Sequence, residues 1–507
     1  MELQLWSLLL PLSTLSSSSS SSLSGSSLLI AATCICFAGI LCCCLLHLRH
    51  LFCKHKLPPG SLGLPLLGET LQFALLRAPI GTPLPFFSSR MQRYGTVFKT
   101  HLLGRPTVVS MDPELTKFLL SNDGKLVQGY YPKVFSRILG PALTLQGASH
   151  RALRELANLS VSSSAVQKLH VETVQEHFLT CLESWRHQAA VLDAQHDFKE
   201  WVFSYSIKLS LGLAADDPTA ELLMRDFFTL SSGYSSVPIN LPGTQFNKVL
   251  KARQRILATI TKLARLRKHK GSKEATDILD VVLKRCDESG ERYCGLDVAE
   301  WIFFFVVGAF ENTFLLIVNV LRFLSENAHV VNQLKRENVA LRRTKTHKEK
   351  LTWDDYLQKM HFTRSVVRET LRLTNIAPYL MKESTEDILF KGMVIPRGWM
   401  VILNFSMVHL SPCYYPNPLE FDPWRWMTSE SDKGSNNPDF LIPFGGGLRR
   451  CPGSPLATFE VSIFIHYLVT LYKWERVFGK DVQRDDVTCL SFPLMRNGLP
   501  LKLQPLD

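Results

Sequence analysis

The chain has 507 residues, 46% of them hydrophobic, and a formal net charge of +12 at pH 7. This length suits one large domain or two to three small ones, and the apolar fraction is enough for a sizeable core. The positive charge is dispersed, with no zinc-ligand spacing and no basic recognition helix, so we expect an anionic membrane surface or an acidic protein partner and no nucleic acid.

Cysteine usage excludes two further classes of protein. Six of the twelve cysteines lie between Cys34 and Cys53, and the others are scattered without a C-x-x-C pair. Neither a disulfide framework nor a structural zinc site fits this pattern. A reducing compartment is the natural location for the body of the chain.

The N-terminus combines a low-complexity segment with an apolar run. Residues 1–27 are rich in serine and predict no regular structure. Residues 28–48 contain an uncharged apolar run long enough to cross a bilayer, and basic residues follow it at once. We therefore predict a single-pass transmembrane anchor with the body of the chain in the cytosol. A cleaved signal peptide is the alternative, which the late position of the run and the missing basic n-region disfavour.

Residues 49–68 are basic and then rich in proline, which predicts a stiff, extended linker. The remaining body of the chain, residues 69–507, begins with a predicted hairpin over residues 96–111. A helix follows over residues 151–159, where His150 and Arg154 are four residues apart and share a face. An arginine in this position suits a carboxylate, although a surface arginine gives the same pattern.

A long, nearly all-apolar helix is predicted over residues 301–324. A second membrane span is the alternative interpretation. Against it, Gly308, Glu311 and Asn312 lie in the middle, and polar groups in hydrocarbon are costly. We therefore expect a core helix in which Gly308 admits a bulky group that Glu311 and Asn312 face.

A further helix is predicted over residues 355–375, and it contains Glu369 and Arg372 in an E-x-x-R pattern. Residues three apart on a helix share a face, so this pair predicts an ion pair. The later segment F-D-P-W-R-W contributes Arg425. Taken alone, such charged pairs are common and indicate no particular function.

The most informative stretch is P-F-G-G-G-L-R-R-C-P-G, at residues 443–453. Three consecutive glycines suggest that the backbone approaches something flat and bulky. Helical spacing resumes after Cys451, which therefore precedes a helix N-terminus, where free amides and the helix dipole favour a thiolate. A thiolate beside arginine is a suitable soft ligand for haem iron.

Five residues of this stretch stand in a fixed register: Phe444, Gly447, Arg449, Cys451 and Gly453. Their spacing resembles the haem-binding signature F-x-x-G-x-R-x-C-x-G of the cytochrome P450 family. The E-x-x-R and P-x-R-W elements precede it in the family's order, and the resemblance covers about residues 56–505. It implies a mainly α fold with a small β-rich lobe, preceded by the transmembrane helix.

The resemblance also implies haem b as the cofactor, with Cys451 as the axial ligand of the iron. The loop residues Phe444, Gly447 and Gly453 would contact the haem. Three cationic residues are implied as further haem contacts: Arg154, Lys382 and Arg449. Lys382 keeps the charge of the arginine that the family often has there, but not its two-pronged geometry.

A buried network of Glu369, Arg372 and Arg425 behind the haem is implied as a structural element. The central helix departs from the family pattern A/G-G-x-D/E-T-T/S, because it reads G-A-F-E-N-T. Glu311 keeps the acid, but Asn312 replaces the threonine that usually helps to deliver protons to bound dioxygen.

Thr313 is one residue further on and about 100° round the helix, so it cannot simply take over that role. We predict that Glu311, Asn312 and Thr313 form the catalytic group. Asn312 would hold a water that relays protons from Glu311, or the oxygen step would be an unusual one.

The implied activity is monooxygenation of a hydrophobic small molecule with O2. Electrons would come from NADPH through a separate NADPH-cytochrome P450 reductase, because the chain has no G-x-G-x-x-G nucleotide motif. The implied location is the endoplasmic reticulum membrane, in contact with lipid, with the catalytic domain in the cytosol.

The substrate class follows from a narrower resemblance, to the land-plant branch that oxidises sterols, brassinosteroids, triterpenoids and some diterpenoids. A phenylalanine-rich central helix suits a rigid polycyclic substrate of plant specialised or hormone metabolism. The alternatives are a diterpenoid oxidase, a reductase-independent haem enzyme that rearranges fatty-acid hydroperoxides, and an inactive haem- or lipid-binding membrane protein.

Overall fold

The computed structural model describes most of residues 56–506, and upstream of them only Thr33. Residues not described in the main part are 65–66, 163, 187–190, 235, 271–275, 290–295, 347–348, 428–439, 478–485, 488–491 and 496. The predicted low-complexity segment and transmembrane anchor therefore lie outside the described residues, apart from Thr33. The fold described below is that of the compact unit His55–Asp507.

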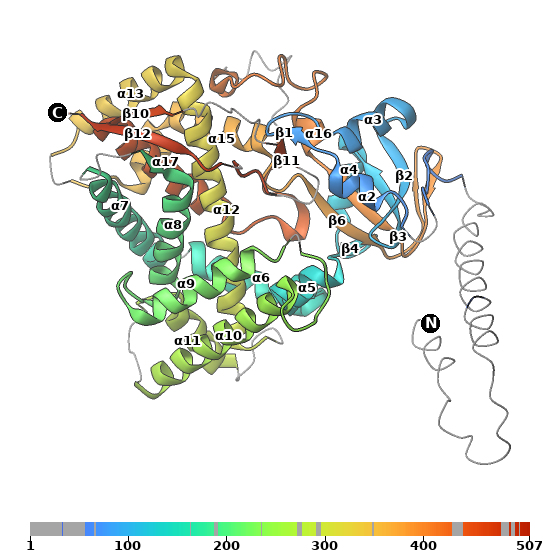
Figure 1. The fold of residues 1–507 in the computed structure, drawn as a ribbon, viewed down its shortest axis with the longest axis horizontal. Coiled ribbons are helices and arrows are strands. Elements are labelled where there is room, and N and C mark those ends of the chain that lie inside the picture. The colour runs from blue at the N-terminus through green and yellow to red at the C-terminus, as the bar shows by residue number, and fades with distance from the viewer. Residues whose placement is uncertain are drawn as a thin grey trace. The chain divides into compact units, whose positions relative to one another are not determined.

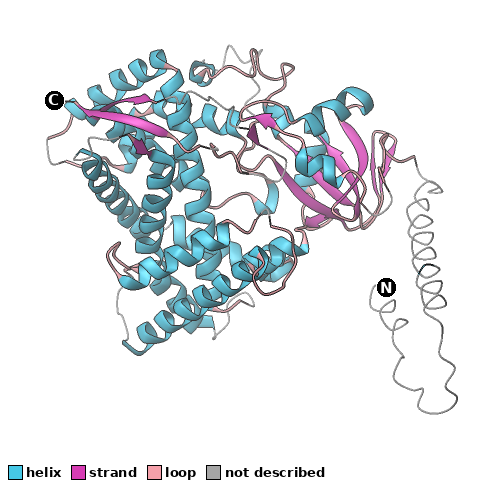
Figure 2. Ribbon diagram, in the orientation of Figure 1, coloured by secondary structure: helices cyan, strands magenta, loops and turns pink. Residues whose placement is uncertain are grey.

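Helices make up most of this unit, and the strands gather mainly in one region beside them (Figures 1 and 2). The α-helices are α2 (Thr70–Leu75), α3 (Pro85–Tyr94), α4 (Pro113–Ser121), α5 (Lys133–Leu139), α6 (Gly147–Ser162), α7 (Ser164–Arg186), α8 (Ala194–Leu211), α9 (Pro218–Ser231), α10 (Gln245–Lys270), α11 (Ile278–Ser289), α12 (Val298–Glu326), α13 (Ala328–Arg343), α14 (Trp353–Lys359), α15 (His361–Thr374), α16 (Ser406–His409) and α17 (Ser454–Leu471). Short 3₁₀ turns are η2 (Pro141–Thr144), η3 (Pro423–Trp426) and η6 (Gly447–Arg449). The expectation of a mainly α fold with a small β-rich lobe is confirmed.

The largest sheet has five strands in the order β2-β3-β9-β6-β4. Its strands are β2 (Val97–Leu102), β3 (Arg105–Ser110), β4 (Val127–Gly129), β6 (Tyr379–Ser384) and β9 (Met400–Asn404). All its pairings are antiparallel except the parallel pairing of β3 with β9. The smaller sheets contain β1 (Ala78–Pro79) with β11 (Asp486–Val487), β7 (Ile388–Phe390) with β8 (Met393–Ile395), and β10 (Tyr472–Arg476) and β5 (Leu192–Asp193) on either side of β12 (Pro500–Pro505).

The five-stranded sheet is covered on both faces. Along β9, Met400 and Ile402 join a core cluster with residues of α2 and α3, whereas Val401 and Leu403 join a second cluster with residues of α4. Side chains of a strand alternate between faces, so a strand buried on both faces reads as a continuous apolar run. All five residues of β9 are buried accordingly.

Helix α12 is the central helix of the unit (Figure 1). It packs against α8, α10, α15 and α17. The Asp297 side chain caps its first turn by accepting a hydrogen bond from the Glu300 amide, a contact that typically contributes about 1 kcal/mol. By length and composition α12 and α17 could each span a membrane, but 72% and 67% of their most apolar windows are buried inside the structure. Such extensive burial is typical of a helix in the core of a folded domain.

The prediction of a single helix over residues 355–375 is wrong, because the structure has two helices there, α14 and α15. Met360 lies between them with non-helical backbone angles and a fully buried side chain. The Glu337 carboxylate of α13 accepts hydrogen bonds from the amides of Phe362 and Thr363, at 2.6 and 2.9 Å. A cap supplied from α13 therefore starts a new helix, and the local sequence gives no sign of it.

Candidate active site

The cysteine loop is a tight turn packed on α4. The Gly445 amide donates to the Ile442 carbonyl at 3.0 Å, and the Cys451 amide donates to the Phe444 carbonyl at 2.9 Å. Gly447 has φ +65°, and a β-carbon there would lie 2.3 Å from the Leu120 carbonyl oxygen. The approach of α4 therefore requires glycine at this position.

Cys451 lies two residues before Gly453, the N-cap residue of α17. The Cys451 side chain is accessible to solvent, although protein atoms crowd around the thiol. Burial raises the pKa of this thiol, and hydrogen bonds from the Gly453 and Ser454 amides and the charge of Arg154 act in the opposite direction. The amides favour a thiolate, as the position before a helix predicts, but the effect of burial is larger and the pKa of the Cys451 thiol stays above its usual value.

One stripe of α12 is open although most of the helix is buried. Gly308 and Asn312 are exposed and one turn apart, and Phe304, Phe305 and Ala309 beside them are half-buried. A β-carbon at Gly308 would meet no atom within 4 Å. Helix α12 packs against α17, the helix that follows Cys451, so the stripe and the cysteine belong to neighbouring elements.

Three cations gather around His150, which belongs to α6. Burial and the charges of Arg449, Arg154 and Lys382 lower the pKa of His150 to about 4, with Asp123 acting in the opposite direction. The Arg449 guanidinium donates to the Leu145 carbonyl at 2.6 Å and to the Gln146 side chain at 2.7 Å. The Arg154 guanidinium donates to the Arg450 carbonyl.

Lys382 forms an ion pair with Asp123 at 2.7 Å, and both side chains are only 2% exposed. The lysine is therefore neutralised by a neighbour that the sequence did not reveal. The Arg154 and Arg449 guanidinium groups donate to carbonyl and amide oxygens of the described residues. The cluster as a whole carries three cations against one carboxylate.

The three consecutive residues expected to form the catalytic group point in different directions. Asn312 lies on the open stripe, and its amide donates to the Gly308 carbonyl at 3.2 Å. Glu311 is buried and accepts a hydrogen bond from Ser231 of α9; burial raises the pKa of its carboxyl. Thr313 is also buried and hydrogen-bonds with Glu460 of α17. Of the two residues expected to face a bound group, Asn312 lies on the open stripe and Glu311 is directed to α9.

Glu369, Arg372 and Arg425 form a buried network. The Arg372 guanidinium donates to both carboxylate oxygens of Glu369, at 2.9 and 2.8 Å, and the Arg425 guanidinium donates to one of them at 3.0 Å. Arg372 also donates to the His409 and Pro418 carbonyls, both at 2.7 Å. The network thus ties α15 to the segment that leads to the cysteine loop.

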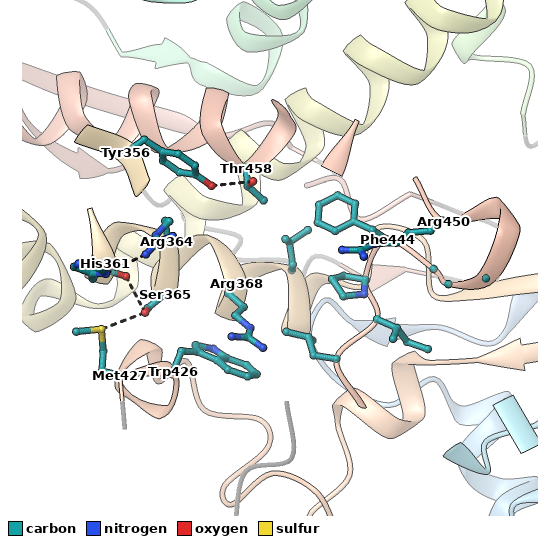
Figure 3. A pocket seen from close by; sticks show the side chains of 17 residues that line it. Tyr356, His361, Arg364, Ser365, Arg368, Trp426, Met427, Phe444, Arg450 and Thr458 are labelled. Atoms are coloured by element: carbon teal, nitrogen blue, oxygen red, sulfur yellow. Dashed lines mark hydrogen bonds between the residues drawn. The ribbon is translucent and has the colours of Figure 1, made fainter. Parts of the chain in front are cut away.

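A pocket of about 850 Å³ lies beside the cysteine loop, between it and α15 (Figure 3). Its lining includes Arg364 and Arg368 of α15 and Arg450 of the loop, and none of the described lining residues is acidic. The Arg368 guanidinium lies over the Trp426 ring, 4.2 Å from its centroid. This side of the loop is therefore cationic.

Comparison with known proteins identifies the class to which this arrangement belongs. A family model described as Cytochrome P450 matches residues 58–502. The chain belongs to the cytochrome P450 family. The structure of retinoic-acid-bound cyanobacterial CYP120A1 is similar, with a TM-score of 0.77 and 26% identity, covering 89% of this chain and all of that one.

Plant enzymes are among its curated relatives. Cytochrome P450 724B1 of Oryza sativa subsp. japonica is 35% identical over 94% of this chain and 98% of its own. Cholesterol 16,22-dihydroxylase CYP90G4 of Trigonella foenum-graecum is 37% identical over 84% and 88%, and cholesterol 22-hydroxylase CYP90B27 of Paris polyphylla is 32% identical over 89% and 92%. The chain is thus a P450 monooxygenase related to plant sterol hydroxylases.

The P450 cofactor haem b fits the residues that the structure brings together. Cys451 would supply a sulfur ligand, Gly308 would leave space for a flat ring, and the cluster of Arg154, Lys382 and Arg449 carries an excess positive charge that would suit the two haem propionates. Carboxylate binding by arginine is favourable because its donors are fixed in a plane.

Sequence reasoning missed the partners that hold these residues. Asp123, Ser231 and Glu460 contact Lys382, Glu311 and Thr313 from distant parts of the chain. None of the three stands in a motif. The one available signal was Glu460 itself, the only acidic residue in the helix that follows the cysteine.

Proposed function

We propose that this P450 hydroxylates a sterol or steroid in plant specialised or hormone metabolism. The observation that carries the proposal is the similarity to cholesterol hydroxylases, at 32–37% identity over 84–89% of the chain. The open stripe of α12 supports it, because Phe304 and Phe305 offer apolar surface for a rigid polycyclic substrate. A diterpenoid would fit the same surface.

Each part of the site has its own role in this proposal. The Cys451 thiolate would hold haem b, which would supply the oxidising chemistry. Arg154 and Arg449 hold its carboxylates, Phe304 and Phe305 exclude water and orient the substrate, and Asn312 holds a water on the open stripe.

Electrons would reach the haem from NADPH through a separate NADPH-cytochrome P450 reductase. The cationic pocket beside the cysteine loop supports this partner, because an acidic surface would dock there with complementary charge. Turnover supported by the reductase should then fall as salt is raised from 0.05 to about 0.5 M, since ions screen such docking. A rate independent of salt would argue against an acidic partner at this pocket.

A second candidate function rests on Asn312, which replaces the usual threonine on the open stripe. A haem enzyme that rearranges fatty-acid hydroperoxides needs neither a reductase nor proton delivery to dioxygen. The two functions predict opposite requirements for NADPH.

The deciding experiment uses microsomes that contain the full chain and a plant reductase. They are supplied with cholesterol, other sterols, a triterpene and a diterpene, and the products are identified by mass. The expected result is a hydroxylated sterol that requires NADPH, is lost in Cys451→Ala and is kept in Cys413→Ala, the control at an exposed free cysteine. Conversion of a fatty-acid hydroperoxide without NADPH, and no sterol product, would overturn the proposal.

A further inference from the structure

A buried ion pair lies beside the cysteine loop. The Lys382 ammonium of β6 and the carboxylate of Asp123, which follows α4, are 2.7 Å apart, and each side chain is only 2% exposed. Both charged atoms are closed to solvent. In such a dry setting a charge is costly to bury without an opposite charge. Each member of this pair therefore compensates the charge of the other.

Asp123 belongs to the segment against which the cysteine loop packs. A β-carbon at Gly447 would lie 2.3 Å from the Leu120 carbonyl oxygen, and one at Gly124 would lie 3.3 Å from the Leu448 side chain. Leu120 and Gly124 stand on either side of Asp123 in the chain. The position of the carboxylate is therefore tied to that of the loop.

Lys382 lies next to an arginine of the same loop. In the pairing of β4 with β6, Gly129 stands opposite Lys382, and a β-carbon at Gly129 would lie 2.8 Å from Nε of Arg449. Burial lowers the pKa of Lys382; the charge of Asp123 opposes this effect, and the charge of Arg449 adds to it. The ammonium and the guanidinium are thus neighbouring like charges, and Asp123 offsets their repulsion.

Stability alone is a weak reason for this pair. Replacement of a buried ion pair by apolar residues of similar size is often neutral or stabilising, because both charges must leave water. A bound haem, in contrast, responds to each charge near it. A cation favours the reduced iron and attracts the haem carboxylates, and an anion does the opposite. The net charge of the pair is therefore a property that the cofactor would report.

We propose that Asp123 is a positioning residue that withholds the charge of Lys382 from the haem. The pair adds no net charge to the site, so the two guanidinium groups of Arg154 and Arg449 balance the two haem carboxylates. Loss of Asp123 leaves an uncompensated ammonium, and loss of Lys382 leaves an uncompensated carboxylate. The two losses therefore shift the properties of the haem in opposite directions. This inference rests on haem binding by the chain and not on which substrate is hydroxylated.

The test measures the reduction midpoint of the haem in the purified, haem-loaded full chain by spectroelectrochemical titration. The variants are Asp123→Asn, Lys382→Met and the double variant. Measurements at about pH 6 keep an unpaired Lys382 charged, and those at about pH 8.5 keep an unpaired Asp123 charged.

The two single variants should move the midpoint in opposite directions. At the lower pH, Asp123→Asn should favour the ferrous form at least about threefold over the wild type. At the higher pH, Lys382→Met should disfavour the ferrous form at least about threefold. The double variant should stay within about 1.5-fold of the wild type at both pH values, because it removes both charges.

Two controls separate this charge effect from a loss of packing. Asp123→Glu keeps the charge and should keep the wild-type midpoint. Glu69→Gln breaks the ion pair of Glu69 with Arg90, whose charged atoms are 2.9 Å apart and whose side chains are 14% and 9% exposed. This pair lies at α2 and α3, and its loss should leave the midpoint unchanged.

Haem release to excess apomyoglobin is the second measurement, and it needs neither substrate nor turnover. Release should be slower than in the wild type for Asp123→Asn at the lower pH and faster for Lys382→Met at the higher pH. If a single variant fails to fold, Asp123→Ser or Lys382→Gln replaces it with the same expectation. Midpoint shifts of the same sign in the two single variants would show a packing role and overturn the proposal. So would unchanged midpoints in both, or a double variant that does not return to the wild-type value.

Discussion

At the scale of single residues, Gly447 shows how the cysteine loop is fixed. Its positive φ is one requirement, and the Leu120 carbonyl is another, because a β-carbon would lie 2.3 Å from that oxygen. A left-handed conformation alone costs an L-residue about 1–2 kcal/mol. In addition, the clash of a β-carbon with the Leu120 backbone would force the cysteine loop away from α4.

We predict that Gly447→Ala destabilises the folded protein by more than this conformational cost and lowers haem incorporation. The matched control is Gly398→Ala, at a glycine with φ +79° and no atom within 4 Å of a built β-carbon. Urea unfolding and haem content of the purified variants measure both effects. Equal destabilisation by the two substitutions would show that Leu120 does not limit the loop.

His409 is a second residue that holds the cysteine loop in place. Its ring contacts the Asn375 side chain at 2.7 Å and accepts from the Ile442 amide at 3.1 Å, so it joins the end of α15 to the start of the cysteine loop. Burial, followed by the charge of Arg372, lowers the pKa of His409 from 6.5 to about 3. The neutral ring is therefore the form that the folded state requires.

The lowered pKa of His409 makes the stability of the folded protein depend on pH. Between pH 6.5 and 3 the unfolded chain binds a proton at His409 that the folded chain does not, so stability decreases as pH falls, by up to about 1.4 kcal/mol per unit. Urea midpoints between pH 7 and 5 should fall more steeply for the wild type than for His409→Gln. His196→Gln, at a side chain 64% exposed, is the control. Parallel slopes in all three proteins would contradict the prediction.

At the scale of elements, the network around Glu369 joins α15 to η3. Its carboxylate accepts from Arg372 and Arg425 and also from the Trp426 indole at 2.9 Å. Removing one member of a buried ionic group leaves the others uncompensated, which typically costs about 3–5 kcal/mol.

We therefore predict that Glu369→Gln lowers the free energy of unfolding by about 3–5 kcal/mol and reduces the yield of haem-loaded protein. The exposed pair of Glu221 and Arg225 on α9 provides the comparison. Glu221→Gln should change stability by less than about 1 kcal/mol. Chemical unfolding measures the free energy of unfolding of both variants. A change of less than about 1 kcal/mol in Glu369→Gln would contradict a stabilising role for the buried network.

The elements also show what the sequence could and could not predict. The central helix, the hairpin of β2 and β3 and the cysteine loop carry local signals of periodicity, turn residues and spacing, and all three are present. The break between α14 and α15 depends on a cap from Glu337, and the pairing of Lys382 with Asp123 joins two strand regions. Contacts between distant segments leave no local pattern, so single-sequence reasoning could not find them.

At the scale of the whole molecule, the apolar segment at residues 28–48 determines a separate property. We predict that the full chain stays with membranes after an alkaline wash, because an uncharged run of this length is stable in a bilayer. Removal of residues 1–48 should release most of the protein with its haem, whereas removal of residues 1–27 should not. Immunoblots of the washed fractions measure the distribution, and retention of the shorter chain at wild-type levels would place the anchor elsewhere.

The order of strands in the main sheet also bears on how the chain is made. β3 pairs in parallel with β9, and the chain between Ser110 and Met400 is about 290 residues long. At about 5–20 residues per second on the ribosome, the β2–β3 hairpin waits roughly 15–60 s for its partner strand. During that interval its apolar edge is open to other chains. Nascent chains of this enzyme should therefore depend on chaperones most strongly between the synthesis of the hairpin and that of β9.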